Sequence, residues 1–262
     1  MKAPSPTHLK PLAAAGFAKS PDAYERGRPD YPSAVWDHMA RLLHLDTAGV
    51  IVEPGAGTGK FTRWLTSLNQ ARILPVEPVP AMRRALAKDP GCMSIIGGLA
   101  EALPVADNCA DAVICAQCFH WFDGAAALTE FHRVLRPGGY LGLVWNVRDE
   151  DAQWVKELTY IMDPYEGNAP RYRSGDWKRH FTERSGFSPL EEIHLAHEVV
   201  CNVQTVVDRV ASISFIAALP EQEHARVTEA VRTLIATHPD TRGKSEFHFP
   251  YRADVFWCRR EK

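Results

Sequence analysis

The sequence predicts an α/β fold in which a mostly parallel sheet carries helices on both faces. Between residues 48 and 147, short β-like runs alternate with helical patterns, and a glycine-rich turn directly follows the first run. This alternation favours a doubly wound sheet, because each helix must return the chain to the edge where the next parallel strand begins. The expected strands in this part span residues 49–53, 72–77, 93–97, 110–116 and 140–146.

The segments between the expected strands show the apolar periodicity of helices. In residues 61–68, apolar side chains recur at the spacing i, i+3, i+4 and i+7, which places them on one face of a helix. Similar stripes occur at 82–86 and over 124–135. The run Arg136-Pro137-Gly138-Gly139 then predicts a type II turn between the last of these helices and the next strand, because Pro presets φ and Gly138 supplies the positive φ.

The pattern loosens after residue 146. Residues 149–165 and 227–235 look helical, residues 164–176 predict a loop, and residues 191–201 and 245–258 look extended. The two extended segments are expected to close the sheet as an antiparallel pair. The prediction is therefore a seven-stranded, mostly parallel sheet whose last strand is antiparallel, with inserted C-terminal helices.

Composition narrows the range of functions. The chain has 262 residues, a net charge of −2 and no long Lys/Arg block, so it lacks the charge pattern of a dedicated nucleic-acid binder. Cys115 and Cys118 form a C-x-x-C, but they lie in an apolar run with no second pair at zinc spacing, which favours buried strand cysteines and no metal. No apolar run reaches the length of a membrane span, and we expect a cytoplasmic protein.

The most informative stretch is Glu53-Pro54-Gly55-Ala56-Gly57-Thr58-Gly59 at the end of the first expected strand. Glycines there let a ligand lie against the backbone, and the following helix offers unpaired N–H groups. The dinucleotide pattern G-x-G-x-x-G is not matched. Its third glycine would fall on Lys60 if the pattern began at Gly55, or on Thr62 if it began at Gly57. An acidic residue before the loop suits an ammonium group, and Glu77 after the second strand suits ribose hydroxyls. These features together indicate S-adenosylmethionine.

Further motifs carry a resemblance to a known family. They lie at residues 17–32, 53–62, 76–83, 100–104, 119–123, 133–139 and 144–149, and include E-P-G-A-G-T-G-K-F-T and R-V-L-R-P-G-G. In this order they resemble the class I S-adenosylmethionine-dependent methyltransferases, within the type 11 group that includes the trans-aconitate methyltransferase-like proteins. The resemblance implies a Rossmann-like fold and methyl transfer from S-adenosyl-L-methionine.

The resemblance also implies a cofactor site. It assigns the methionine part of the cofactor to Glu53 and the backbone of Gly55, Ala56 and Gly57, and the ribose to Glu77. It places Met82 near the adenine, with Leu99, Ala100 and Glu101 along the adenine edge; related families often have Asp where this chain has Leu99. It places Gln117 beside the sulfonium, and Tyr24 and Tyr31 in a lid.

The substrate side is expected around His120, Trp121, Trp145 and Asn146, which lie at the ends of the fourth and fifth expected strands. His120 is a candidate general base, or alternatively a polar neighbour of the packed aromatics. The chain is expected to be one domain, residues 1–262, with a lid and helical segment at 1–45, a cofactor-binding core at 46–150, and substrate-side helices with closing strands at 151–262.

The predicted function is methyl transfer to a small-molecule acceptor, either an organic acid or a planar aromatic metabolite. A tRNA or protein methyltransferase and a non-catalytic S-adenosylmethionine-binding protein are the alternatives, and the failed glycine spacing disfavours an NAD-dependent oxidoreductase. We expect no nucleic-acid or membrane partner, and either a monomer or a homodimer.

Overall fold

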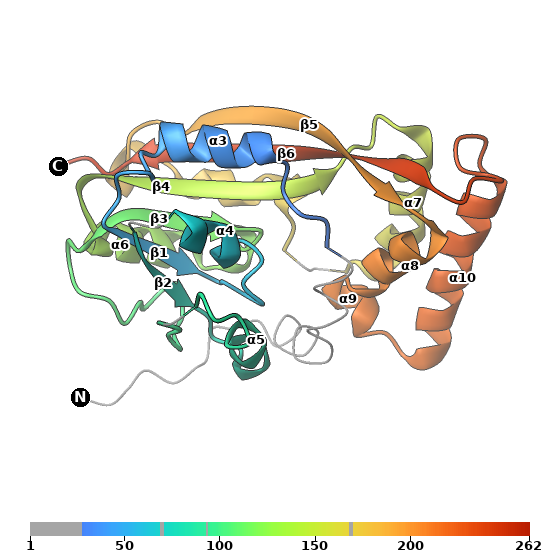
Figure 1. Ribbon diagram of the computed structural model, residues 1–262, viewed down its shortest axis with the longest axis horizontal. Helices are drawn as coiled ribbons and strands as arrows, with labels where there is room; N and C mark the ends of the chain where they lie inside the picture. Colours follow the sequence, from blue (N-terminus) through green and yellow to red (C-terminus); the bar gives the residue numbers. More distant parts are fainter. Residues whose placement is uncertain (1–27, 69–70, 93, 168–169) are drawn as a thin grey trace.

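A six-stranded sheet forms the centre of the fold, with the strand order β2-β1-β3-β4-β6-β5 (Figure 1). The computed structural model describes residues 28–68, 71–92, 94–167 and 170–262. The strands are β1 (Val50–Pro54), β2 (Arg72–Val76), β3 (Ala110–Ala116), β4 (Leu135–Arg148), β5 (Glu191–Cys201) and β6 (Phe247–Arg259). The first four pair in parallel, whereas β6 runs antiparallel to both β4 and β5. The α/β class and the antiparallel last strand are as the sequence predicts.

The prediction of a seventh strand at 93–97 is wrong for the residues that the structure describes there. Between β2 and β3 the chain makes a single parallel bridge, Val76 with Ile96. Ile96 donates its N–H to the carbonyl of Pro75, and Glu77 donates to the carbonyl of Ile96. Gly97 and Gly98 follow at once and offer no side chains to pack on a sheet, so the pairing stops after one rung.

Residues 136–139 do not form the expected turn ahead of the strand. Strand β4 already begins at Leu135 and continues through them. Gly138 does have the predicted positive φ, +79°. The segment is an irregularity within the strand: Ala110 and Ala112 of β3 face Leu135 and Tyr140, so the register shifts between them. A glycine with positive φ is a common device for such a bulge, because no Cβ opposes that conformation.

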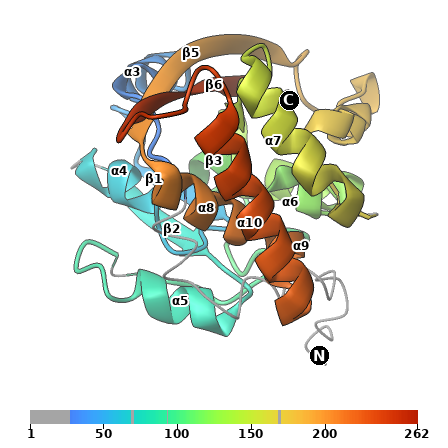
Figure 2. The same cartoon turned by 90° about the vertical axis from the view of Figure 1, so that its right-hand side faces the viewer.

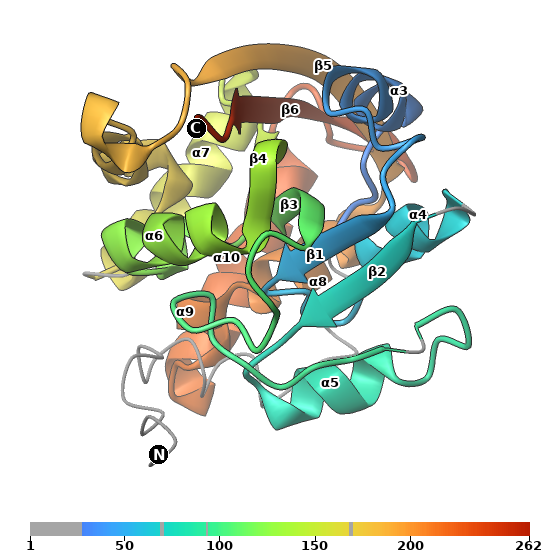
Figure 3. The ribbon, with the colours of Figure 1, turned by 90° about the vertical axis from the view of Figure 1, so that its left-hand side faces the viewer.

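Helices cover both faces of the sheet, as predicted (Figure 3). The helices are α3 (Ser33–Leu42), α4 (Thr62–Ser67), α5 (Pro80–Leu86), α6 (Gly124–Val134), α7 (Gln153–Met162), α8 (Val203–Ala211), α9 (Ser214–Ala217) and α10 (Glu221–Thr237). Alternate strand residues face opposite layers. Ile51 packs in one core cluster with Met39 of α3 and Leu65 of α4, whereas Val52 packs in another with Phe131 of α6.

The C-terminal helices form a separate layer beyond one end of the sheet (Figure 2). Helices α7, α8 and α10 share a buried apolar cluster with the N-terminal end of β6. The cluster includes Trp154, Val210, Val231 and Phe249. Helices α8, α9 and α10 are inserted between β5 and β6, which matches the expected inserted helices. In the part of the chain that the structure describes, no helix is both long and apolar enough to cross a membrane.

Candidate cofactor-binding site and acceptor cleft

The glycine loop between β1 and α4 has the backbone geometry that its sequence predicts. Gly55, Gly57 and Gly59 have φ values of +72°, +59° and +88°. A Cβ added at Gly59 would lie 2.2 Å from Cδ1 of Leu86, whereas a Cβ added at Gly57 would meet nothing within 4 Å. Gly59 is therefore required for packing, and Gly57 faces open space. This is the arrangement expected where a ligand approaches the backbone.

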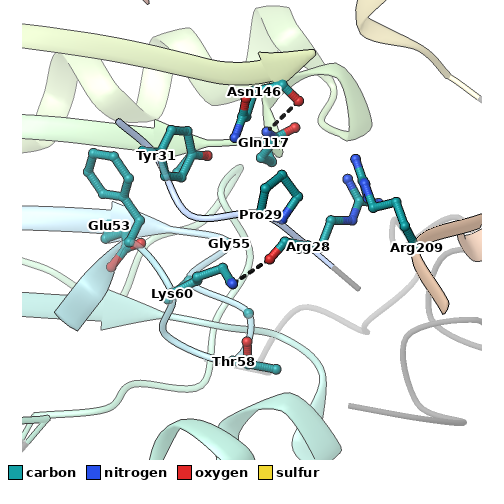
Figure 4. A pocket seen from close by; sticks show the side chains of 14 residues that line it. Arg28, Pro29, Tyr31, Glu53, Gly55, Thr58, Lys60, Gln117, Asn146 and Arg209 are labelled. Carbon is teal, nitrogen blue, oxygen red and sulfur yellow. Dashed lines mark hydrogen bonds between the residues drawn. The ribbon is translucent and has the colours of Figure 1, made fainter. Parts of the chain in front are cut away.

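The open space beside the loop is a small pocket with a cavity volume of about 40 Å³ (Figure 4). Its walls come from residues 28–31, the tip of β1, the glycine loop, the tips of β3 and β4, and α8. The side chains and backbone that line it include Arg28, Tyr31, Glu53, Gly55, Ala56, Gly57, Lys60, Gln117, Asn146 and Arg209. The structure thus brings together six of the residues assigned to the cofactor, Tyr31, Glu53, Gly55, Ala56, Gly57 and Gln117.

Glu53 is the acidic group of this pocket. Its side chain is almost fully buried, with 1% of the residue exposed, and its Oε2 accepts a hydrogen bond from Thr62 Oγ1 at 2.5 Å. Burial raises the pKa of Glu53 to about 8, an effect that the Thr62 hydrogen bond opposes. At neutral pH the carboxyl group is therefore mostly protonated, and a cationic ligand group placed beside it would favour its ionisation.

Glu77 lies beneath the glycine loop and does not line the pocket beside Glu53. Its Oε2 accepts the N–H of Gly57 at 2.9 Å and its Oε1 accepts the N–H of Val79 at 2.7 Å. Burial raises the pKa of Glu77, and these two backbone donors oppose that rise. The carboxylate thus fixes the loop conformation, while each oxygen keeps a second lone pair. Its role toward ribose hydroxyls stays a prediction.

The predicted adenine contacts lie outside the pocket that Glu53 lines. Met82 is buried on α5, and Ala100 is buried in the loop that follows the Val76–Ile96 bridge. Glu101 accepts the N–H of Asp123 at 2.9 Å, so it anchors the start of α6. Leu99 pairs with Ala102 in a tight turn. Their roles toward adenine stay predictions.

The predicted lid is described from residue 28 onward, so Tyr24 lies outside the described residues. Tyr31 packs edge-on against Trp36 and Phe61, with ring centroids 5.3 Å apart in both pairs. Lys60 holds this segment over the glycine loop, because its Nζ donates to the carbonyl of Arg28 at 2.5 Å and pairs with Asp30 at 2.9 Å. Lys60 had no predicted role, although it directly follows Gly59 in the sequence.

Gln117 stands where the pocket meets a second cleft. It has a positive φ of 63°, which is uncommon for a residue other than glycine and is often found at functional sites. Its Nε2 donates to the carbonyl of Asn146 at 3.1 Å. Asn146 in turn donates to the carbonyl of Asp30 at 3.2 Å, and its Oδ1 lies 2.7 Å from Nε2 of His197. The β3 and β4 tips are therefore tied to the lid segment.

The second cleft has a cavity volume of about 580 Å³, which leaves room for an acceptor beside the smaller pocket. All four residues predicted on the substrate side, His120, Trp121, Trp145 and Asn146, line it. Trp145 Nε1 donates to His120 Nδ1 at 3.0 Å, so the proton of the neutral imidazole lies on Nε2. This tautomer makes His120 a donor at Nε2. A general-base role, which needs a lone pair there, stays a prediction.

The basic side of this cleft was not predicted from the sequence. Arg148, Arg171 and Arg209 line it together with Tyr172 and Trp177. Arg148 lies within the motif at 144–149, and Arg209 interrupts the apolar face of α8, between buried Val206 and Val210. A charged residue at a buried helical position indicates either a partner or a ligand.

Comparisons with known proteins identify methyltransferases as relatives of this chain. Residues 52–143 match the family model described as a methyltransferase domain. An uncharacterised methyltransferase-like protein of Schizosaccharomyces pombe is 34% identical over 238 residues, covering 91% of this chain and 93% of its own. An uncharacterised methyltransferase of Mycobacterium tuberculosis is 37% identical over 237 residues, covering 90% and 91%.

Solved structures agree on the fold. A structure from Anaeromyxobacter dehalogenans, described as a type II methyltransferase, superimposes with a TM-score of 0.63 at 21% identity and covers 89% of this chain and 97% of its own. At that identity the likeness concerns the fold alone, whereas the two curated relatives extend over nearly the whole chain. The chain belongs to the class I S-adenosylmethionine-dependent methyltransferases.

Proposed function

We propose that this protein transfers a methyl group from S-adenosylmethionine to a small-molecule acceptor. The observation that carries the proposal is the junction between the two cavities: Arg28, Gln117, Asn146 and Arg209 line both the pocket at the glycine loop and the aromatic cleft. A donor in the first and an acceptor in the second would meet at these residues.

The chain's residues supply binding and alignment. The sulfonium of the cofactor, when bound, supplies an electrophilic methyl group. Glu53 would hold the ammonium of the methionine moiety, and the open backbone at Gly57 would let the chain of that moiety lie close. Gln117, whose Nε2 donates to the carbonyl of Asn146, would orient the groups at the junction together with Asn146. Much of the rate enhancement in such a site comes from alignment in line with the breaking bond.

The aromatic wall would shape the acceptor side. Trp145 packs in a tilted arrangement against Tyr172 and Trp177 at centroid distances of 4.7 and 4.6 Å, and all three line the cleft. Such a wall excludes water and accepts a planar or partly apolar molecule. The Nε2–H of His120 would donate to an oxygen of that molecule. An organic acid or a planar aromatic metabolite therefore fits the proposal.

Incubation with methyl-labelled S-adenosylmethionine and matched acceptor panels tests the proposal. We expect labelled product from a panel of small organic acids and phenols, with trans-aconitate included because of the motif resemblance. We expect no label in bulk tRNA or in a protein mixture. Label in either macromolecule and in none of the small molecules would contradict the proposed acceptor class. Cofactor binding without any turnover would favour a non-catalytic protein.

A further inference from the structure

Arg209 is a buried cation whose guanidinium is not satisfied by the protein. Only 7% of the residue is exposed, and in the described part of the chain its Nε and Nη1 have no hydrogen-bond partner. Leaving a buried charged donor unpaired costs more than leaving a neutral one unpaired, and native proteins rarely do so without a reason. Arg209 lines both the donor pocket and the acceptor cleft. Arg209 thus lies where the two cavities meet, beside the place where a ligand would bind.

The fold holds Arg209 rigidly in this position. A capping box starts α8: Asn202 Oδ1 accepts the N–H of Thr205 at 3.0 Å, and Thr205 Oγ1 accepts the N–H of Asn202 at 2.8 Å. The buried residues Val206 and Val210 pack the helix into the C-terminal cluster. From this helix, Arg209 extends toward Arg28 at the mouth of the pocket (Figure 4). A preorganised guanidinium binds an anion with little loss of side-chain entropy.

The other charged groups around the cleft do not neutralise Arg209. Several cations of the cleft have carboxylate partners: Arg171 and Arg173 pair with Glu166, Lys178 with Glu192, and Arg252 with Asp254. The carboxylates at 149–151 also line the cleft, where Asp149 accepts the N–H of Asp151 and Glu150 accepts the hydroxyl of Thr159. Within the described residues, no carboxylate pairs with Arg209 or Arg148.

Arg148 adds to the positive potential beside Arg209. Its Nη1 contacts Met162 Sδ at 3.5 Å, a weak acceptor that cannot balance a charge. Burial, with the nearby charge of Arg209 as the next contribution, lowers the pKa of Arg148 to about 10. The two guanidiniums therefore repel each other across the acceptor cleft. A cationic sulfonium at the junction would add to this repulsion unless an anion lay between the charges.

We propose that Arg209, supported by Arg148, binds an anionic group of the methyl acceptor, either a carboxylate or a phosphate. The proposal rests on the proposed function and narrows it, because a neutral aromatic metabolite would leave both guanidiniums uncompensated. The planar fork of an arginine matches both kinds of oxyanion and pairs with them through two parallel hydrogen bonds. The competing occupant is the carboxylate of the cofactor's own methionine moiety.

Anion binding by the wild type and by Arg209→Gln, with S-adenosylhomocysteine saturating, tests the proposal. The probes are citrate, 4-hydroxybenzoate and inorganic phosphate, each compared with chloride at equal ionic strength in thermal unfolding and calorimetric titration. We expect at least one probe to bind the wild type, and roughly 10- to 100-fold weaker binding of it to the variant, as for the loss of charge-assisted hydrogen bonds. Which probe binds distinguishes carboxylate from phosphate.

Two further variants separate this role from others. Arg226→Gln removes an exposed arginine of α10 and should bind the probes as the wild type does. Arg209→Lys keeps the charge without the fork and should show an intermediate loss, which also covers the case in which Arg209→Gln does not fold. The melting temperature of ligand-free Arg209→Gln should equal or exceed that of the wild type, because an uncompensated buried charge is removed.

Three results would overturn the proposal: no probe whose binding depends on Arg209, a marked loss of stability in both Arg209 variants, or a loss of S-adenosylhomocysteine affinity as large as the loss of anion affinity. The last result would assign Arg209 to the donor. If the wild type does not bind S-adenosylhomocysteine at all, the proposed function itself fails, which is a different outcome.

Discussion

Replacing Glu53 with Gln should raise the free energy of unfolding of the ligand-free protein, and the gain should grow with pH. The folded protein holds the pKa of this carboxyl group at about 8, against an ordinary value of 4.5. Between these pH values the folded state keeps a proton that the unfolded state has released. The free energy of unfolding of the wild type therefore falls as pH rises through this window, and the contribution levels off above about pH 8.

The variant lacks this titration, and its amide oxygen can still accept from Thr62. We expect a gain on the order of a few kcal/mol near pH 8 and little difference below pH 4.5. Denaturant unfolding of both proteins across this range measures the effect. The exposed Glu229 of α10 offers a matched control, since Glu229→Gln makes the same substitution outside the pocket. A destabilised Glu53→Gln protein at pH 8 would show that the carboxylate stabilises the fold instead of serving a ligand.

Substitutions at two glycines of one loop should separate stability from binding. Gly59→Ala should destabilise the protein by roughly 2–4 kcal/mol, because the new Cβ combines left-handed strain with a collision against the buried side chain of Leu86. Gly57→Ala should cost only about 1 kcal/mol, since its Cβ meets nothing within 4 Å. The same Cβ would occupy the pocket, so the affinity for S-adenosylhomocysteine should fall roughly tenfold or more.

Urea unfolding midpoints and calorimetric affinities of the two variants check this pair. Each variant acts as the control for the other, because both add one methyl group to the same loop. Wild-type affinity in Gly57→Ala would mean that no ligand lies against the loop. Equal destabilisation by both substitutions would mean that the loop is tightly packed throughout.

The sequence predicts those parts of the fold and site that depend on neighbours along the chain. The alternation of strands and helices and the positions of Gly55, Gly57 and Gly59 depend on local pattern, and the structure agrees with them. The position of Glu53 at the pocket is also predictable from the local sequence. A strand end and the turn after it lie at the same edge of a parallel sheet.

The remaining features depend on contacts between distant segments. A strand at 93–97 was predicted from its apolar residues, but only Ile96 finds a partner on β2. Glu77 has the predicted place after β2, yet its hydrogen bond to Gly57 joins residues 20 positions apart and has no local signature. Arg209 comes to the pocket only because α8 packs beyond the strand tips, and no motif predicts that packing.

Calorimetric titration of the folded protein with S-adenosylmethionine at pH 7, in two buffers of different ionisation heat, is the most direct test of the central claim. We expect binding of one molecule per chain with release of most of one proton, because Glu53 has a pKa of about 8 and ionises beside the cofactor's ammonium. Glu53→Gln should bind more weakly and release almost none. No binding by well-folded protein, or binding with the same proton count in the variant, would contradict the claim.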